Sequence, residues 1–176
     1  MNAIDLLMKQ HKKTNAALEK ASEGKLDAKE SKKAADELVA HMVIEEHIFY
    51  PHIRQLMKDM VGESFEEHTV ARFALARALT ARGDEQIKAR FTVLKELIEH
   101  HVEEEEEDMF PKVQKAIDAA ELEKLGDRME RMFESAVAAG LDALVTGASQ
   151  DLRRPNGSGL SADGATATKA PSRATR

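Results

Sequence analysis

The sequence contains no cysteine and no tryptophan, and aromatic residues make up only 4% of it. Without cysteine there can be no disulfide, zinc–thiolate site or iron–sulfur cluster, so any metal ligand must be His, Asp or Glu. No apolar stretch approaches the ~20 residues that a membrane-spanning helix needs. The first residues lack the basic and apolar segments of a secretory signal peptide. We therefore expect a cytoplasmic protein without a membrane partner.

The charge of the chain is high but unevenly distributed. Charged residues make up 33% of the 176 residues, and the formal net charge is −6. From Ala148 onward five basic residues outweigh two aspartates, so this segment carries +3 and the remainder carries −9. An acidic domain is a poor ligand for nucleic acid, and we expect no nucleic-acid partner. The sequence leaves protein partners unknown.

Apolar residues recur at helical spacing in five segments, and the composition, rich in Ala, Glu, Lys and Leu, favours helix. The predicted helices are about 2–21, 28–57 with a kink at Pro51, 64–79, 84–117 with a second proline at Pro111, and about 120–138. This pattern predicts an all-α fold, an antiparallel up-down-up-down four-helix bundle with an added fifth C-terminal helix. We assign residues 1–147 to this domain and residues 148–176 to a disordered basic tail rich in Ser, Gly, Ala, Thr, Pro and Arg.

Local signals place the starts of three helices. Asp27 with Glu30, and Ser64 with Glu67, have the spacing of a capping box. Gly62 indicates a break before the third helix, and Asp84 is the expected N-cap of the fourth.

One motif occurs twice. His41 is followed by Glu45 and then by Tyr50-Pro51, and His101 is followed by Glu105 and then by Phe110-Pro111 at the same spacing. Residues four apart lie one turn apart on the same face of a helix. Each copy can therefore aim one imidazole and one carboxylate at the same point, and such ligands suit iron, manganese or zinc.

The other two bundle helices each carry a histidine in the middle of the inward stripe. The inward polar set is His11, His41, Glu45, His68, His101 and Glu105. Six ionisable groups in one core are costly unless they are paired or bound to metal. Four imidazoles and two bridging carboxylates can serve two metal ions, and we predict these six residues as the metal ligands.

The order His, His-x-x-x-Glu, His, His-x-x-x-Glu resembles the hemerythrin-like family, the HHE cation-binding domain, over roughly residues 2–119. The resemblance implies two non-haem iron ions, oxo- or hydroxo-bridged, inside the bundle. By position, His11, His41, His68 and His101 would be terminal iron ligands, and Glu45 and Glu105 would bridge. It also implies a small-molecule partner: H2O2, O2 or NO.

Two positions depart from better-known members of that family. Oxygen carriers have a second histidine where this chain has Arg72, and some regulatory relatives have a glutamate where it has Met42. Fewer protein ligands leave open coordination positions, which favour reaction over reversible carriage. We therefore expect catalase-like H2O2 breakdown, with a non-enzymatic O2, NO or iron sensor or iron-binding module as the alternative.

Several alternatives stay open at the level of sequence. Tyr50 is placed opposite His41 on an ideal helix, which argues against a role in the site unless Pro51 re-aims the helix. Glu106 is an alternative to Glu105, and Asp108 is a candidate neighbour of a ligand. Arg72 either extends to solvent or pairs with a ligand carboxylate. The choice of iron over manganese is not settled by residue type.

Two other functions compete with this interpretation. Ferritin-like sites use Glu-x-x-His, and no histidine in the chain has a glutamate three residues before it. A metal-free helical interaction protein is the remaining alternative, in which removal of His41 and His101 would leave the fold intact.

Overall fold

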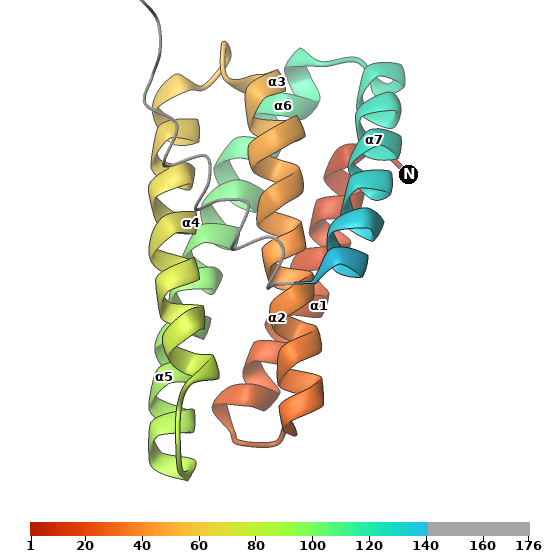
Figure 1. The fold of residues 1–176 in the computed structure, drawn as a ribbon. Helices are drawn as coiled ribbons and strands as arrows, with labels where there is room; N and C mark the ends of the chain where they lie inside the picture. Colours follow the sequence, from red (N-terminus) through yellow and green to blue (C-terminus); the bar gives the residue numbers. More distant parts are fainter. Residues whose placement is uncertain (141–176) are drawn as a thin grey trace, which may run out of the picture.

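The computed structural model describes residues 1–140, and within them every regular element is helical. The elements are α1 Ala3–Ser22, α2 Ala28–Ile44, the π-helical turn η1 Glu45–Phe49, α3 Tyr50–Ile53, α4 Lys58–Leu79, α5 Asp84–Glu104, the π-helical turn η2 Glu105–Met109, α6 Phe110–Ala116 and α7 Ala119–Ala139. The long helices α1, α2, α4 and α5 form an antiparallel bundle, and α7 packs against α1 and α2 (Figure 1). The predicted four-helix bundle with a fifth helix is confirmed. Residues 141–176, which include the predicted tail, lie outside the described part.

Side-chain caps begin three of these helices. The carboxylate of Asp27 accepts a hydrogen bond from the Glu30 amide while the Glu30 side chain accepts one from the Asp27 amide, so the predicted capping box is confirmed. Asn2 and Asp118 likewise cap α1 and α7, each accepting a hydrogen bond from the amide three residues on. Because a cap satisfies backbone N–H groups that the helix leaves free, these positions fix where the chain turns between helices.

Two predicted helix starts are wrong. Gly62 and Ser64 lie inside α4, and the hydroxyl of Ser64 donates to the Met60 carbonyl oxygen at 3.0 Å instead of capping a helix. Burial of Met57 and Val61 against the rest of the core outweighs the ~1 kcal/mol that a helical glycine costs. At α5 the N-cap is Gly83, with φ of 77°, and Asp84 is the first helical residue.

The core consists of two apolar clusters separated by a polar layer. One cluster lies around η1, η2 and α7 and includes Ile44, Phe49 and Phe110. The other lies between the far ends of α1, α2, α4 and α5 and includes Leu38, Leu75 and Leu94. The six predicted ligands occupy the layer between them, and all six are buried.

Helix α7 covers the end of the bundle that carries the π-helical turns. It contributes Leu122, Leu125 and Met129 to the first cluster. It also brings Gly126 against the first residues of the chain, where a Cβ would collide with the Met1 carbonyl oxygen and lie 2.8 Å from the Ala3 nitrogen. Glycine is therefore required here for close backbone approach, not for an unusual φ. Within residues 1–140 no helix is both long and apolar enough to cross a membrane.

We predict opposite effects from two glycine-to-alanine substitutions. Gly126→Ala should lower the free energy of unfolding by about 1–3 kcal/mol, because the new methyl group must displace backbone. Gly62→Ala, at a helical position where nothing lies within 4 Å of the new Cβ, should raise it by about 0.5–1 kcal/mol. Urea titrations of both variants measure the difference. Equal effects would mean that α7 does not dock against the N-terminus as described.

Candidate metal centre

The two His-x-x-x-Glu motifs lie at equivalent places in the bundle. His41 is near the end of α2 and Glu45 opens η1, while His101 is near the end of α5 and Glu105 opens η2. Both carboxylates have 0% of their surface exposed. The spacing of one helical turn directs each pair into the polar layer, as the sequence predicted.

Each motif runs directly into a π-helical turn. The Tyr50 amide donates to the Glu45 carbonyl oxygen five residues earlier, and the Phe110 amide donates to that of Glu105. A π turn accommodates one extra residue, so it rotates the side chains after it by about 100° relative to a continuous α-helix. The proline after each aromatic residue has no N–H to continue the ladder.

This rotation overturns the expectation for Tyr50. Its side chain is buried, and its hydroxyl donates to Glu105 Oε1 at 2.8 Å. The hydroxyl oxygen also lies 3.3 Å from His68 Nε2 and 3.4 Å from His101 Nε2. The ideal-helix angle that placed Tyr50 opposite His41 fails because the turn between them is not α-helical.

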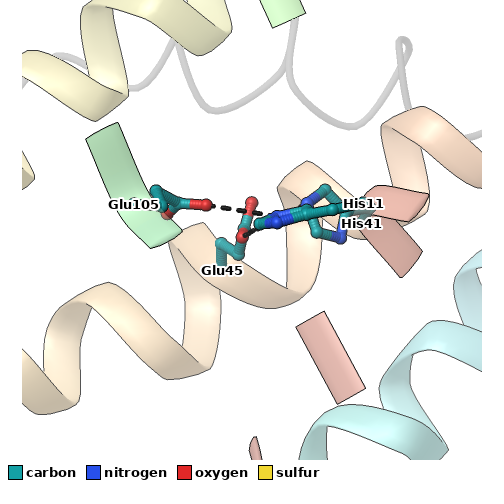
Figure 2. A group of neighbouring side chains, drawn as sticks. All are labelled: His11, His41, Glu45 and Glu105. Carbon is teal, nitrogen blue, oxygen red and sulfur yellow. Dashed lines mark ion pairs between the residues drawn. The ribbon is translucent and has the colours of Figure 1, made fainter. Parts of the chain in front are cut away.

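His11 from α1 and His68 from α4 complete the layer. His11 Nε2 lies 3.3 Å from Glu105 Oε2 and 3.8 Å from Glu45 Oε1. His41 Nε2 lies 3.2 Å from Glu45 Oε1, and His68 Nε2 lies 3.4 Å from Glu45 Oε2. Figure 2 shows His11 and His41 directed at the two carboxylates. The four helices thus bring their polar groups to one place.

The convergent atoms form two groups that share one carboxylate. One group is His11, His41, Glu45 and Glu105, and the other is Glu45, His68 and His101; within each group the ligand atoms lie within 4.8 Å of one another. His68 Nε2 and His101 Nε2 are 3.0 Å apart. Two ligands about 2.1 Å from one cation and at right angles to each other have this separation, about 3.0 Å.

The outer nitrogen of each imidazole is held by a neighbour. The Nδ1 atoms of His11 and His68 lie 2.8 Å from Glu106 and 3.0 Å from Glu46. Those of His41 and His101 lie 2.8 Å from Gln10 and 2.7 Å from Glu67. An Nδ1–H donated outward leaves the Nε2 lone pair facing the centre, which is how proteins orient metal-binding histidines.

Several inward atoms have no hydrogen-bond partner. They are His11 Nε2, Glu45 Oε1 and Oε2, and Glu105 Oε2. Buried polar atoms without partners are rare because each costs about 1–3 kcal/mol. Cations bound between the imidazoles and carboxylates would satisfy all of them. The donor set, four imidazoles and two carboxylates, therefore fits a pair of first-row metal ions.

A small cavity adjoins the imidazole side of this layer. Its volume is about 10 Å³, and all four histidines line it together with Thr14, Leu38, Met42, Ile98 and Val102. That is roughly the room one water-sized molecule needs. The centre thus has space for a very small molecule between mostly apolar walls.

Protonated imidazoles compensate the negative charge of the carboxylates when no metal is bound. Burial disfavours the charged form of His11, but attraction to the nearby carboxylates of Glu105 and Glu45 outweighs it and raises the pKa of His11 to about 10. For His68, burial is likewise outweighed, by Glu45 and Glu46, and its pKa rises to about 9. Burial lowers the pKa of His41 to about 3. Two of the imidazoles are therefore cationic at neutral pH in the metal-free centre.

For four residues the structure gives a position that the sequence left open or did not indicate. Asp108 is exposed and takes no part. Glu106 supports His11 from outside while Glu105 lies at the centre. Arg72 pairs with Glu46 through two hydrogen bonds of 2.7 and 2.8 Å, not with a ligand carboxylate. Gln10 was not singled out by any motif; its signal is its place directly before His11, which Glu67 repeats before His68.

The fold and site define a four-helix bundle with a buried His/Glu centre suited to cations. The family model described as the hemerythrin HHE cation binding domain matches residues 2–113, from α1 to α6. The chain belongs to this family, and the expected resemblance is confirmed.

Relatives extend the similarity beyond the matched domain. The uncharacterized proteins Rv2633c of Mycobacterium tuberculosis and Mb2666c of Mycobacterium bovis are each 28% identical to this chain over 157 residues, which cover 86% of it and 98% of the relative. A crystal structure of a hemerythrin HHE cation binding domain-containing protein, the Rv2633c homolog from Mycobacterium kansasii, is similar with a TM-score of 0.65 and 27% identity. The alignment covers 83% of this chain and 98% of that one.

We predict that Glu45→Gln removes more metal than loss of any single imidazole, because Glu45 belongs to both groups of donors. An amide has one carbonyl oxygen and cannot bridge two cations as a carboxylate does. Metal content per chain after anaerobic loading is the measurement. Glu107→Gln, on the exposed side of η2, is the matched control and should bind as much metal as the unchanged protein. Full loading of Glu45→Gln would contradict the shared-carboxylate arrangement.

We also predict that metal affinity rises with pH between about 6.5 and 9. The protons on His11 and His68 must leave before a cation binds, and their pKa values are raised to about 10 and 9. Because these pKa values are raised on folding, the two groups stabilise the metal-free fold fully below about pH 6.5, and this contribution is lost as pH rises through 9 to 10. The increase in Tm on metal binding should therefore grow with pH. A Tm increase independent of pH would show that these imidazoles are neutral without metal.

Proposed function

We propose that the six buried residues bind two non-haem iron ions and that this pair breaks down hydrogen peroxide. The single observation behind the proposal is the set of partnerless inward atoms on His11, Glu45 and Glu105 beside a cavity with room for one very small molecule. Imidazole nitrogen favours iron over the harder cations that prefer all-oxygen sites. Membership of a cation-binding family supports a bound metal, and the imidazole donors favour a first-row transition metal over Mg²⁺ or Ca²⁺.

The two ion positions have different surroundings. One group offers four donors, and the other offers three, His68, His101 and Glu45. The Tyr50 hydroxyl lies beside the three-donor group, 3.3 and 3.4 Å from its two Nε2 atoms. A cation held by fewer protein donors keeps positions open for a small molecule. We therefore place the reacting molecule at this position.

The protein's own contribution is positioning and proton control. Burial, followed by the charges of Glu105 and Glu45, raises the pKa of Tyr50 well above its usual value near 10, so its hydroxyl keeps its proton at neutral pH. It donates to Glu105 Oε1, and it would be available to donate a proton to a peroxide molecule at this position. On the imidazole side of the layer, Leu38, Met42, Ile98 and Val102 form apolar walls around a cavity of about 10 Å³.

A pair of iron ions would supply the electrons for disproportionation. One peroxide takes up two electrons and two protons and leaves as two waters; a second gives back two electrons and two protons and leaves as O2. Glu45, which belongs to both donor groups, would help to hold both ions, and the Tyr50 hydroxyl is placed to hold a proton beside the three-donor group.

The expected result is O2 evolution from peroxide by iron-loaded protein, at one O2 per two peroxides, and none by metal-free protein. Tyr50→Phe should bind the same amount of iron but turn over about 10²-fold more slowly, since a positioned proton donor contributes at least that factor. An oxygen electrode with parallel iron analysis measures both. Charge-transfer absorption in the near ultraviolet reports the loaded centre.

The alternative is a sensor of O2 or NO, for which the three-donor group would offer the same open positions. Iron-loaded protein whose spectrum changes with O2 or NO, but which evolves no gas from peroxide, would favour this alternative over the enzyme. Failure to bind iron after anaerobic ferrous loading would exclude both.

A further inference from the structure

A second cluster of potential metal ligands lies at the surface, along the seam between α4 and α5. It consists of Glu67 from α4 and of His100 and Glu104, one turn apart on α5. His100 Nε2 lies 3.5 Å from Glu104 Oε1 and 4.0 Å from Glu67 Oε1. The His100 side chain is 66% exposed, so solvent reaches the cluster directly.

The distances suit a cation. Ligands about 2.1 Å from a tetrahedral metal ion are about 3.4 Å apart. The separations of 3.5 and 4.0 Å exceed this by about 0.1 and 0.6 Å, which a change of rotamer of the exposed His100 side chain can close. One imidazole and two carboxylates, completed by water, form a donor set for divalent first-row ions. In the described part of the chain, no lysine or arginine forms an ion pair with Glu67 or Glu104.

Glu67 is held in place independently of this cluster. Its Oε2 lies 2.7 Å from His101 Nδ1, so its other oxygen is fixed toward His100. One ligand of the surface cluster is therefore already oriented by the buried centre. Preorganisation of a ligand lowers the ordering cost of binding.

The matching half of the molecule has no such cluster within the described residues. Gln10 is the counterpart of Glu67. Each directly precedes the lone histidine of its helix, and each holds Nδ1 of a motif histidine, His41 for Gln10 and His101 for Glu67. Ala40 and Ile44 stand where the second motif has His100 and Glu104. His100 and Glu104 therefore have no counterpart in the support of the buried centre, since the first motif has apolar residues at these two positions.

We propose that Glu67, His100 and Glu104 form a third, solvent-facing site for a divalent first-row transition-metal ion. This site is separate from the two buried positions and goes beyond the proposed peroxide chemistry. Glu67 connects it to the centre, with one carboxylate oxygen toward His100 and the other on His101.

The test is zinc titration of the iron-loaded protein, followed by calorimetry. The unchanged protein should bind one more zinc ion per chain, in the micromolar range, than His100→Ala or Glu104→Gln. Both substitutions are at exposed or half-exposed positions, and circular dichroism with iron analysis verifies that fold and centre are intact. Glu67 is left unchanged because it also orients His101.

His47→Ala is the matched control, because His47 is an exposed histidine outside the cluster; it should keep the additional zinc. Equal zinc binding by the unchanged protein and His100→Ala would overturn the proposal, as would the same loss in His47→Ala. The comparison does not depend on iron. If the buried centre fills with zinc instead, the difference of one ion between the unchanged protein and His100→Ala remains, so failure of the peroxide chemistry is distinguishable from failure of this site.

Discussion

The burial of two carboxylates at the middle of the bundle is the constraint on which the rest of the site depends. Glu45 and Glu105 are fully buried, and an uncompensated charge there would cost several kcal/mol. Imidazoles from all four bundle helices surround them, and in the metal-free state protons on His11 and His68 supply the counter-charge, since both pKa values are raised. A site that already attracts positive charge this strongly needs only proton release to accept cations.

The two halves of the centre follow one plan. The residue after each motif glutamate, Glu46 or Glu106, holds the lone histidine of another helix. The aromatic residue after each π turn packs on that same imidazole: Tyr50 on His68 at 5.5 Å and Phe110 on His11 at 5.8 Å between ring centroids. Because the plan is shared, the differences between the halves stand out. Of the two aromatic residues, Tyr50 has a hydroxyl and Phe110 does not.

Sequence reasoning reached the fold and the six central residues because both depend on spacing. The helical period of 3.6 residues predicted the helices, and His-x-x-x-Glu placed two pairs on inward faces. It failed for Tyr50, because the π turn between Glu45 and Tyr50 shifts every later residue by one position relative to a continuous α-helix. It also failed for Gly62 and Ser64, whose local signals are overridden by burial of Met57 and Val61. The sequence could not show which carboxylate holds which imidazole, because this pairing depends on how neighbouring helices are aligned.

A second difference between the two halves favours one side of the centre for the proposed chemistry: the Nδ1 partner of the motif histidine. The His41 Nδ1 partner is the neutral amide of Gln10, while that of His101 is the carboxylate of Glu67. A carboxylate partner increases the basicity of an imidazole and strengthens it as a ligand. His68 and His101 both have such a partner, so their three-donor group compensates for fewer donors with stronger ones. A cation there would be held by stronger donors and would keep open positions beside Tyr50, as the proposed reaction with peroxide requires.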